Sequence, residues 1–156
     1  MPTITRADLL EVGFYHCTRQ PAARIAVRLA ALAYGSGQRL LIVGAPERLE
    51  ALDTALWVDD PESFLPHALA GGEHDADQPI LLSETPDPAN NARLLMVLET
   101  GLPAEFDRFD RVLNLFDDGS DAHLRARTDW KAIADREGVE RVYWQQSPQG
   151  KWERQG

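Results

Sequence analysis

The run Leu40-Leu41-Ile42-Val43 is the feature of this sequence that most restricts the fold. Four consecutive apolar residues without alternation are typical of a strand that is covered on both faces, as in a parallel sheet. Before it, apolar residues recur at helical spacing from Ala22 to Ala33, and Gly35-Ser36-Gly37 follows them. This spacing predicts an amphipathic helix that ends at the glycines. A helix that leads into a buried strand indicates an α/β fold with right-handed crossovers.

The alternation continues to a second helix, and a loop-rich middle with short strands follows it. A strand rich in β-branched and aromatic residues precedes the first helix, and a second helix begins at Pro46-Glu47. The expected strands span residues 11–17, 40–43, 80–82, 94–97 and 111–116, a helix spans 121–136, and a hairpin spans 139–153. We therefore predict one three-layer α/β domain over residues 1–156, with a mostly parallel central sheet, helices on both faces and a C-terminal hairpin.

Composition and charge favour an ordinary globular protein and disfavour general nucleic-acid binding. Hydrophobic residues make up 44% of the chain and charged residues 26%, close to globular averages. The formal net charge is −9, and the stretch between Val58 and Asn90 has eight acidic residues and no Lys or Arg. Such a stretch would repel a phosphate backbone, so direct contact with DNA is not expected.

The cellular compartment expected from the sequence is the cytoplasm. The chain has one cysteine, Cys17, which excludes an intramolecular disulfide and favours a reducing environment. Residues 1–6 show no basic run followed by an apolar run, so no signal peptide is expected. No apolar stretch approaches the roughly 20 residues needed to cross a bilayer, and we expect no contact with a membrane.

The motifs that bind nucleotides in α/β proteins are missing from the sequence. There is no G-x-x-x-x-G-K-[ST] string, and the turn His16 to Gln20 after the first strand has no glycine. The turn after the second strand has only Gly44, and Glu47 occupies the helix start where a phosphate would lie. We therefore expect no nucleotide cofactor and no catalytic activity.

Metal ligands and carboxylate pairs give no stronger indication of an active site. The potential ligands are His16, Cys17, His67, His74 and His123, and no two of them have the spacing of a zinc site. His16 and Cys17 are neighbours on a strand and would point to opposite faces. The pairs Asp59-Asp60 and Asp117-Asp118 come with no evident partner base or ligand set. We expect no metal site, and a small nucleotide-dependent or nucleic-acid-processing α/β enzyme is the rival hypothesis.

The segment from Trp57 to Gly71 is the unusual part of the chain. It places Trp57, Phe64, Leu65 and Leu69 in a loop that two prolines keep out of regular structure. One interpretation is a plug over one end of the core. The other is an exposed aromatic patch, the kind of surface on which interface hot spots are built.

This segment closely resembles the chi subunit family of bacterial DNA polymerase III. The resemblance lies in Ala55-Leu56-Trp57, in Pro61-Glu62-Ser63-Phe64-Leu65-Pro66-His67 and in Leu69-Ala70-Gly71. Weaker matches cover nearly the whole chain, at Phe14-Tyr15, residues 37–42, Leu52-Asp53, Arg127, Trp130-Lys131 and Lys151-Trp152.

The resemblance implies a non-catalytic subunit of the clamp-loader assembly, with a Rossmann-like fold and no nucleotide. A subunit of this family pairs one-to-one with the psi subunit and grips the acidic C-terminal tail of single-stranded DNA-binding protein, so that it reaches DNA only indirectly. By this match Trp57, Phe64, Leu65 and Pro66 would face psi, or alternatively a helicase-like partner.

A second binding surface is expected on the predicted helix 121–136. Arg127 and Lys131 are i, i+4 neighbours with Trp130 beside them, and Arg125 adds a cation from the adjacent face. Such a cluster can take a carboxylate and a phenyl ring, as offered by an acidic tail that ends in Phe. A solvated helix face with Trp130 in the core and direct binding of single-stranded DNA are the alternatives. Asp117-Asp118 departs from the family pattern, and its charges would weaken the approach of an acidic tail.

Overall fold

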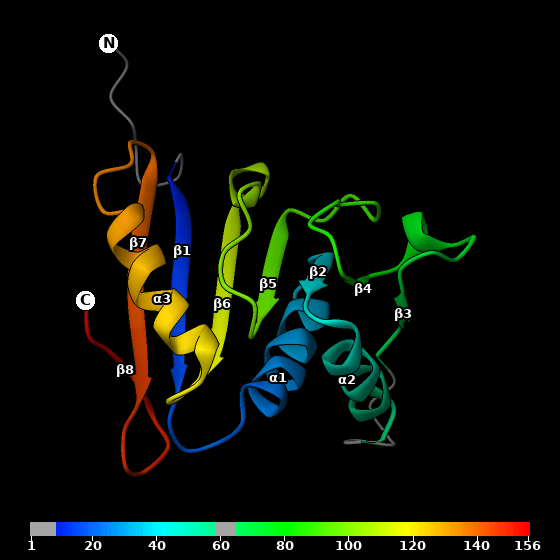
Figure 1. Cartoon of the computed structure of the whole chain (residues 1–156). Coiled ribbons are helices and arrows are strands. Elements are labelled where there is room, and N and C mark those ends of the chain that lie inside the picture. The colour runs from blue at the N-terminus through cyan, green and yellow to red at the C-terminus, as the bar shows by residue number, and fades with distance from the viewer. Residues whose placement is uncertain (1–8, 59–64) are drawn as a thin grey trace.

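One sheet organises the part of the chain that the structure describes, residues 9–58 and 65–156 of a computed structural model (Figure 1). It has eight strands in the order β3-β4-β2-β5-β6-β1-β7-β8. Neighbouring strands pair in parallel except β7 and β8, which form an antiparallel hairpin. The predicted mostly parallel α/β sheet with a C-terminal hairpin is confirmed.

Strands and helices alternate from β1 to α2, and four of the described strands then follow one another before α3. The strands are β1 (Leu10–Cys17), β2 (Leu40–Val43), β3 (His67–Leu69), β4 (Ile80–Ser83), β5 (Leu94–Leu98), β6 (Arg111–Asp117), β7 (Val139–Gln146) and β8 (Trp152–Arg154). The helices are α1 (Ala22–Gly35), α2 (Pro46–Val58) and α3 (Asp121–Ala132), with short 3₁₀ helices η2 (Asp75–Asp77) and η3 (Phe106–Arg108). Among the described residues, no helix combines the length and the hydrophobicity that a bilayer span requires.

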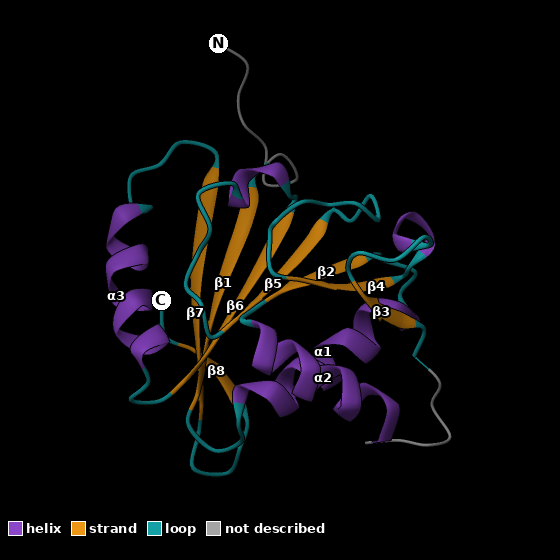
Figure 2. Cartoon of the chain, turned by 45° about the vertical axis from the view of Figure 1, so that its right-hand side comes forward, coloured by secondary structure: helices purple, strands orange, loops and turns teal. Residues whose placement is uncertain are grey.

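Helices cover both faces of the sheet, which makes the three expected layers. Figure 2 shows α3 on one side and α1 with α2 on the other. Leu40 and Ile42 of β2 pack in the core beneath α1 and α2, whereas Leu41 and Val43 pack in the core on the α3 side. Because side chains alternate along a strand, a four-residue apolar run is buried only when both faces are covered.

The starts of α1 and α3 are fixed by side chains from the end of β6 and from the loop that follows it. Asp117 Oδ1 accepts a hydrogen bond from the backbone N–H of Ala22 at 2.7 Å. Ser120 is the N-cap of α3, and its hydroxyl accepts from the N–H of His123 at 3.1 Å. Each contact satisfies a backbone donor that a helix start leaves open. The carboxyl end of β6 thereby sets the position of two helices on opposite faces.

Helix α3 is shorter than the sequence pattern indicates, ending at Ala132 instead of Arg136. Beyond it the backbone bonds become shorter-range, with the N–H of Ala134 bonded to Lys131 and that of Arg136 to Ile133. This tightening brings Ile133, which is 5% exposed, into the core and turns the chain toward β7. Periodicity alone does not reveal it, because residues 133–136 still continue the helical pattern.

Strand β3 lies inside the segment that the sequence analysis expects to be a loop. Residues His67 to Leu69 pair with β4 at the edge of the sheet. The His67 ring holds them there, with Nδ1 2.7 Å from the carbonyl oxygen of Leu65 and Nε2 2.9 Å from Asp53 Oδ1 on α2. Pro66 directly precedes β3, a position that an edge strand tolerates.

Candidate functional site

A pocket between α3 and β7 brings together the cations and the aromatic ring that the sequence analysis singles out. Its volume is about 360 Å³, and it is lined by Arg127, Trp130, Lys131, Tyr143, Gln155 and Gly156. Arg127 and Lys131 are exposed, one helical turn apart. We call this the α3–β7 pocket; it presents two cations beside two aromatic rings.

Trp130 is half-buried, so it neither projects freely into solvent nor disappears into the core. Its ring meets Phe14 edge to face at 5.2 Å and Tyr143 at 5.6 Å. The guanidinium of Arg141 lies 3.9 Å from the centre of the Trp130 ring, and its Nη1 donates to the Trp130 carbonyl at 2.7 Å. These contacts fix the ring in place, so a ligand that docks against it costs little conformational entropy of the Trp130 side chain.

Arg125 does not line the α3–β7 pocket. Its Nε lies 3.3 Å from Asp129 Oδ1, and its Nη2 donates to the carbonyl of Leu102 at 3.4 Å. Asp129 in turn accepts from the N–H of Leu102 at 3.0 Å. Arg125 therefore ties α3 to the loop after β5, while Arg127 and Lys131 carry the charge at the pocket.

Sequence reasoning missed three residues that line this pocket, Tyr143, Gln155 and Gly156, and it also missed Arg141, whose guanidinium packs on the Trp130 ring. Two of them had a usable signal: Arg141 and Tyr143 are two apart on a strand, so they share a face. Burial raises the pKa of Tyr143, which keeps its hydroxyl protonated at neutral pH. Gln155 and Gly156 lie beyond the predicted hairpin, which ends at residue 153, and backbone hydrogen bonds with Tyr143 place them at the pocket.

The aromatic segment presents an exposed apolar surface beside β3. The side chains of Trp57, Val58 and Leu69 are 48%, 60% and 42% exposed, whereas Leu65 is 7% exposed and belongs to the core. The Trp57 ring lies 4.5 Å from that of His67. Pro66 is half-buried, and we call this surface, with Trp57, Val58, Pro66 and Leu69, the β3 patch. Phe64 lies outside the described residues.

A third group of functional side chains gathers at the carboxyl ends of β1 and β6. Asp118 Oδ1 lies 2.7 Å from His16 Nε2 and 3.8 Å from His123 Nδ1. The expectation that Asp117-Asp118 has no evident partner base or ligand set is therefore wrong for Asp118. Of its two partners, His16 lies 102 positions away in the sequence and His123 lies close by on α3. Burial, and then the charges of His16 and Arg127, lower the pKa of His123. Cys17 lies on the other face of the sheet, as the strand pattern predicts, and burial raises its pKa to about 12.

Glu99 is a buried carboxylate at the end of β5, with only 3% of its side chain exposed. It accepts hydrogen bonds from the N–H of Asp117 and from the Ser120 hydroxyl, and Arg48 lies 3.8 Å away. Burial raises the pKa of Glu99. The hydrogen bond from the Asp117 N–H lowers this pKa, and the negative charge of the Asp117 carboxylate raises it. The Glu99 backbone φ of 59° is rare for a residue other than glycine. Glu99 thus stabilises the β6–α3 junction at an electrostatic cost.

The backbone donors that a nucleotide phosphate would use are satisfied within the chain. Gln146 Oε1 accepts from the N–H groups of Arg19 and Gln20, and Asp117 accepts from that of Ala22. A phosphate at the start of α1 would have to displace two side chains, one of them a carboxylate of its own charge.

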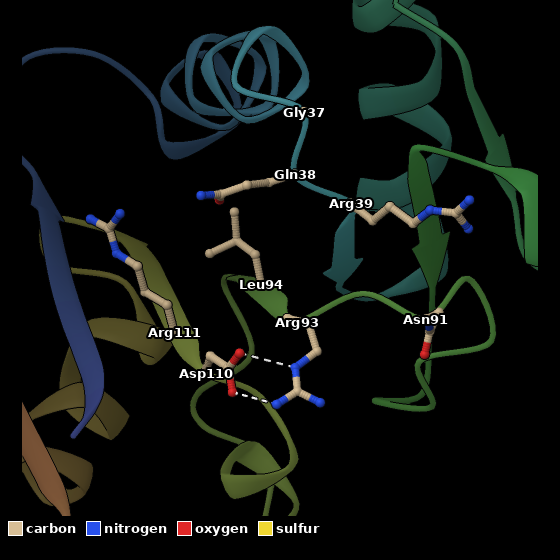
Figure 3. A pocket seen from close by; sticks show the side chains of 8 residues that line it. All are labelled: Gly37, Gln38, Arg39, Asn91, Arg93, Leu94, Asp110 and Arg111. Atoms are coloured by element: carbon tan, nitrogen blue, oxygen red, sulfur yellow. Dashed lines mark hydrogen bonds and ion pairs between the residues drawn. The ribbon is translucent and has the colours of Figure 1, made fainter. Parts of the chain in front are cut away.

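A further pocket, at the amino ends of β2, β5 and β6, is rich in arginine (Figure 3). Arg93 is held by Asp110 through two hydrogen bonds of 3.0 and 2.7 Å. Arg39 donates to the carbonyls of Ala76 and Asn90. Because these guanidinium groups are occupied by groups of the chain itself, this pocket is a weaker candidate for an anionic ligand than the α3–β7 pocket.

Comparison with known proteins identifies the family. The family model described as DNA polymerase III chi subunit, HolC, matches residues 9–140. The DNA polymerase III subunit chi of Pseudomonas aeruginosa is 35% identical over 115 residues, which cover 72% of this chain and 77% of the relative. The family-model match includes β1 to β6, the β3 patch and all of α3. The chain belongs to the DNA polymerase III chi subunit family.

Proposed function

We propose that this chain is a non-catalytic adaptor of the polymerase III clamp-loader assembly, which holds the acidic C-terminal tail of single-stranded DNA-binding protein and pairs with psi. The observation that carries the proposal is the α3–β7 pocket, where exposed Arg127 and Lys131 flank the ring of Trp130. The pocket is thus locally positive on a chain whose net charge is −9.

The chemistry of the pocket fits a short acidic peptide that ends in an aromatic residue. A terminal carboxylate would accept hydrogen bonds from Arg127 and Lys131, and a phenyl ring would pack against Trp130 and Tyr143. Carboxylates further along the tail would meet Arg127 or Lys131 at the rim. The fixed ring of Trp130 favours one docked arrangement.

Calorimetry with a peptide ending in Asp-Ile-Pro-Phe tests the tail site. We expect binding at low salt that weakens at least about 10-fold in Arg127→Ala and in Lys131→Ala, because a charge-assisted hydrogen bond contributes roughly 1.5–3 kcal/mol. Arg125→Ala is the matched control on the same helix and should change the affinity little. No binding at low salt, or full binding by Arg127→Ala with Lys131→Ala, would exclude the site. A bare oligonucleotide that binds with steep salt dependence would instead favour DNA as the ligand.

For psi we propose the β3 patch, extended by Phe64 and supported from below by Leu65. Trp57, Val58 and Leu69 place three exposed apolar side chains near one edge of the sheet, and exposed apolar side chains that form one patch usually mark a partner site. Buried Leu65 and the His67 ring, which contacts Asp53, hold this edge against α2. Pro66 restricts the backbone just before β3, so the patch is ordered before a partner arrives.

Co-purification with psi tests this surface. Phe64→Ala is expected to abolish co-purification while the melting temperature changes little. Leu32→Ala, at a site on α1 that is 69% exposed, is the control and should co-purify normally. A loss of several degrees in Phe64→Ala would show that the segment is a plug over the core, and unchanged co-purification would exclude Phe64 from the interface.

A further inference from the structure

The His16, Asp118 and His123 group lies at the point in the sheet where neighbouring crossovers leave in opposite directions. After β1 the chain passes into α1 on one face, and after β6 it passes into α3 on the other (Figures 1 and 2). Because β1 and β6 are neighbours, their carboxyl ends lie side by side between the two connections. Open α/β sheets place their ligands at such switch points.

Two imidazoles and one carboxylate converge there within metal-binding range. One ligand atom from each of His16, Asp118 and His123 lies within 4.8 Å of the other two. The histidine side chains are only 9% and 10% exposed, whereas that of Asp118 is 61% exposed. Ligands around a tetrahedral zinc ion are about 3.3 Å apart, given bond lengths near 2.0–2.1 Å. The exposed Asp118 has room for the adjustment that this spacing needs.

The hydrogen bond to the His16 ring suits a metal ligand, whereas the one to the His123 ring occupies the nitrogen that would bind the ion. Tyr143 Oη lies 3.1 Å from His16 Nδ1, and a hydroxyl can donate or accept. When His16 Nε2 binds an ion, its proton can reside on Nδ1 and be donated to Tyr143. Histidine ligands of metals are oriented by such a partner on the other ring nitrogen. The N–H of Gly119 donates to His123 Nδ1 at 3.0 Å, so this nitrogen carries a lone pair.

We propose that His16, Asp118 and His123 form a binding site for a borderline divalent transition-metal ion of the zinc type. Imidazole nitrogens select such ions over Mg²⁺ and Ca²⁺, which prefer sites made of oxygen atoms. Three protein ligands leave a fourth position for water. Binding displaces the 2.7 Å contact between His16 and Asp118 and the Gly119 hydrogen bond, which limits the affinity. The site shares no ligand with the α3–β7 pocket, although Tyr143 lines that pocket and also contacts His16. Zn²⁺ titration and peptide calorimetry therefore test the two proposals separately.

Titration of the untagged full-length chain with Zn²⁺ tests the proposal. We expect one equivalent to bind, with Asp118→Ala, His16→Ala and His123→Ala each weakening the affinity at least about 10-fold. His74→Ala removes an exposed histidine outside the cluster and should bind like the original chain. Asp118→Ala changes an exposed side chain, so it remains informative even if a buried-histidine variant fails to fold. Bound Co²⁺ should give visible absorption bands that weaken in the same three variants.

Three outcomes would overturn the proposal. The first is the absence of binding at 10 equivalents of Zn²⁺ (roughly the excess that reveals a weak site). The second is that Asp118→Ala and His123→Ala bind Zn²⁺ with the affinity of the original chain. The third is that the chain binds Mg²⁺ as it binds Zn²⁺. In each case the cluster would be a set of hydrogen bonds that ties β1 to the start of α3, and nothing more.

Discussion

Neighbouring residues of β1 have opposite surroundings, and this controls their reactivity. His16 faces Asp118 and His123 on the α3 side of the sheet, whereas Cys17 is buried under α1 and is 4% exposed. The Cys17 thiol is surrounded by apolar side chains, with the Asp117 and Glu99 carboxylates nearby. Both effects disfavour a thiolate, which is the reactive form of cysteine.

Cys17 is therefore expected to be inert in the folded chain. Its pKa rises from 9.0 to about 12, so at pH 8 the thiolate fraction falls about 1,000-fold. Reaction with a thiol reagent such as dithionitrobenzoate should be at least that much slower in buffer than in 8 M urea (roughly enough to unfold a small domain). The urea reaction provides the control for reagent activity. Rapid labelling in buffer would mean that β1 and α1 separate readily.

At the scale of elements, the contact between α3 and the loop after β5 depends on Gly101. Its φ is 78°, and a Cβ there would lie 2.4 Å from Cγ of Arg125, a side chain held by Asp129 and Leu102. Gly101→Ala should destabilise the chain by about 2–3 kcal/mol through backbone strain and displacement of Arg125. Gly138→Ala, at φ 79° with open space around it, should cost only about 1 kcal/mol.

Urea unfolding of these variants checks this prediction. Adding Arg125→Ala to Gly101→Ala should recover the steric part of the loss, which a double-mutant cycle isolates. Equal stability of the Gly101 and Gly138 variants would show that the loop moves away from α3 without cost.

The junction of β5, β6 and α3 should make stability depend on pH through Glu99. Burial raises the pKa of Glu99 above its ordinary value of 4.5, so the folded chain keeps a proton that the unfolded chain has lost. The stability contributed by this group is fully present below pH 4.5 and is lost as pH rises through the folded pKa. Glu99→Gln keeps an acceptor for the Asp117 N–H but removes the titration.

We therefore expect the difference in free energy of unfolding, Glu99→Gln minus the original chain, to increase between pH 4.5 and about 7. The upper pH is roughly where ordinary carboxylates are fully ionised. Denaturant melts across this range measure the difference, with Glu73→Gln at an exposed site as control. A difference that stays constant with pH would show that water reaches Glu99 in solution.

Elements defined by their own residues were predictable from the sequence, and those defined by distant contacts were not. Local sequence pattern is enough to predict β2 and β5, which are runs of buried apolar residues, and α1, whose apolar residues have amphipathic spacing. Strand β3 has three residues and exists because His67 contacts Asp53, which no window of sequence displays. The His16 and Asp118 contact joins residues 102 positions apart, so ligand spacing along the chain could not reveal it.

At the scale of the whole molecule, the two proposed binding surfaces lie toward opposite edges of the sheet. The β3 patch borders the first strand in the sheet order, and the α3–β7 pocket borders the last two (Figure 1). Four strands separate β4 from β7, and both surfaces are built on one framework of parallel pairing. We propose that residues 1–156 form one folding unit, since the core on each face runs beneath strands from both halves of the sheet.

This arrangement predicts that the two partners bind without affecting one another. Groups more than about 7–10 Å apart with no shared partner have additive effects within roughly 0.3–0.5 kcal/mol, which corresponds to about 2-fold in affinity. The affinity for the tail peptide should therefore change less than about 2-fold when psi is added or when Phe64 is replaced by Ala. Conversely, Arg127→Ala should co-purify with psi normally. Calorimetry of the peptide with the chain alone and with its psi complex measures the coupling directly. A change of 10-fold or more would contradict independent binding and would show that the two sites are coupled through the chain or through psi itself.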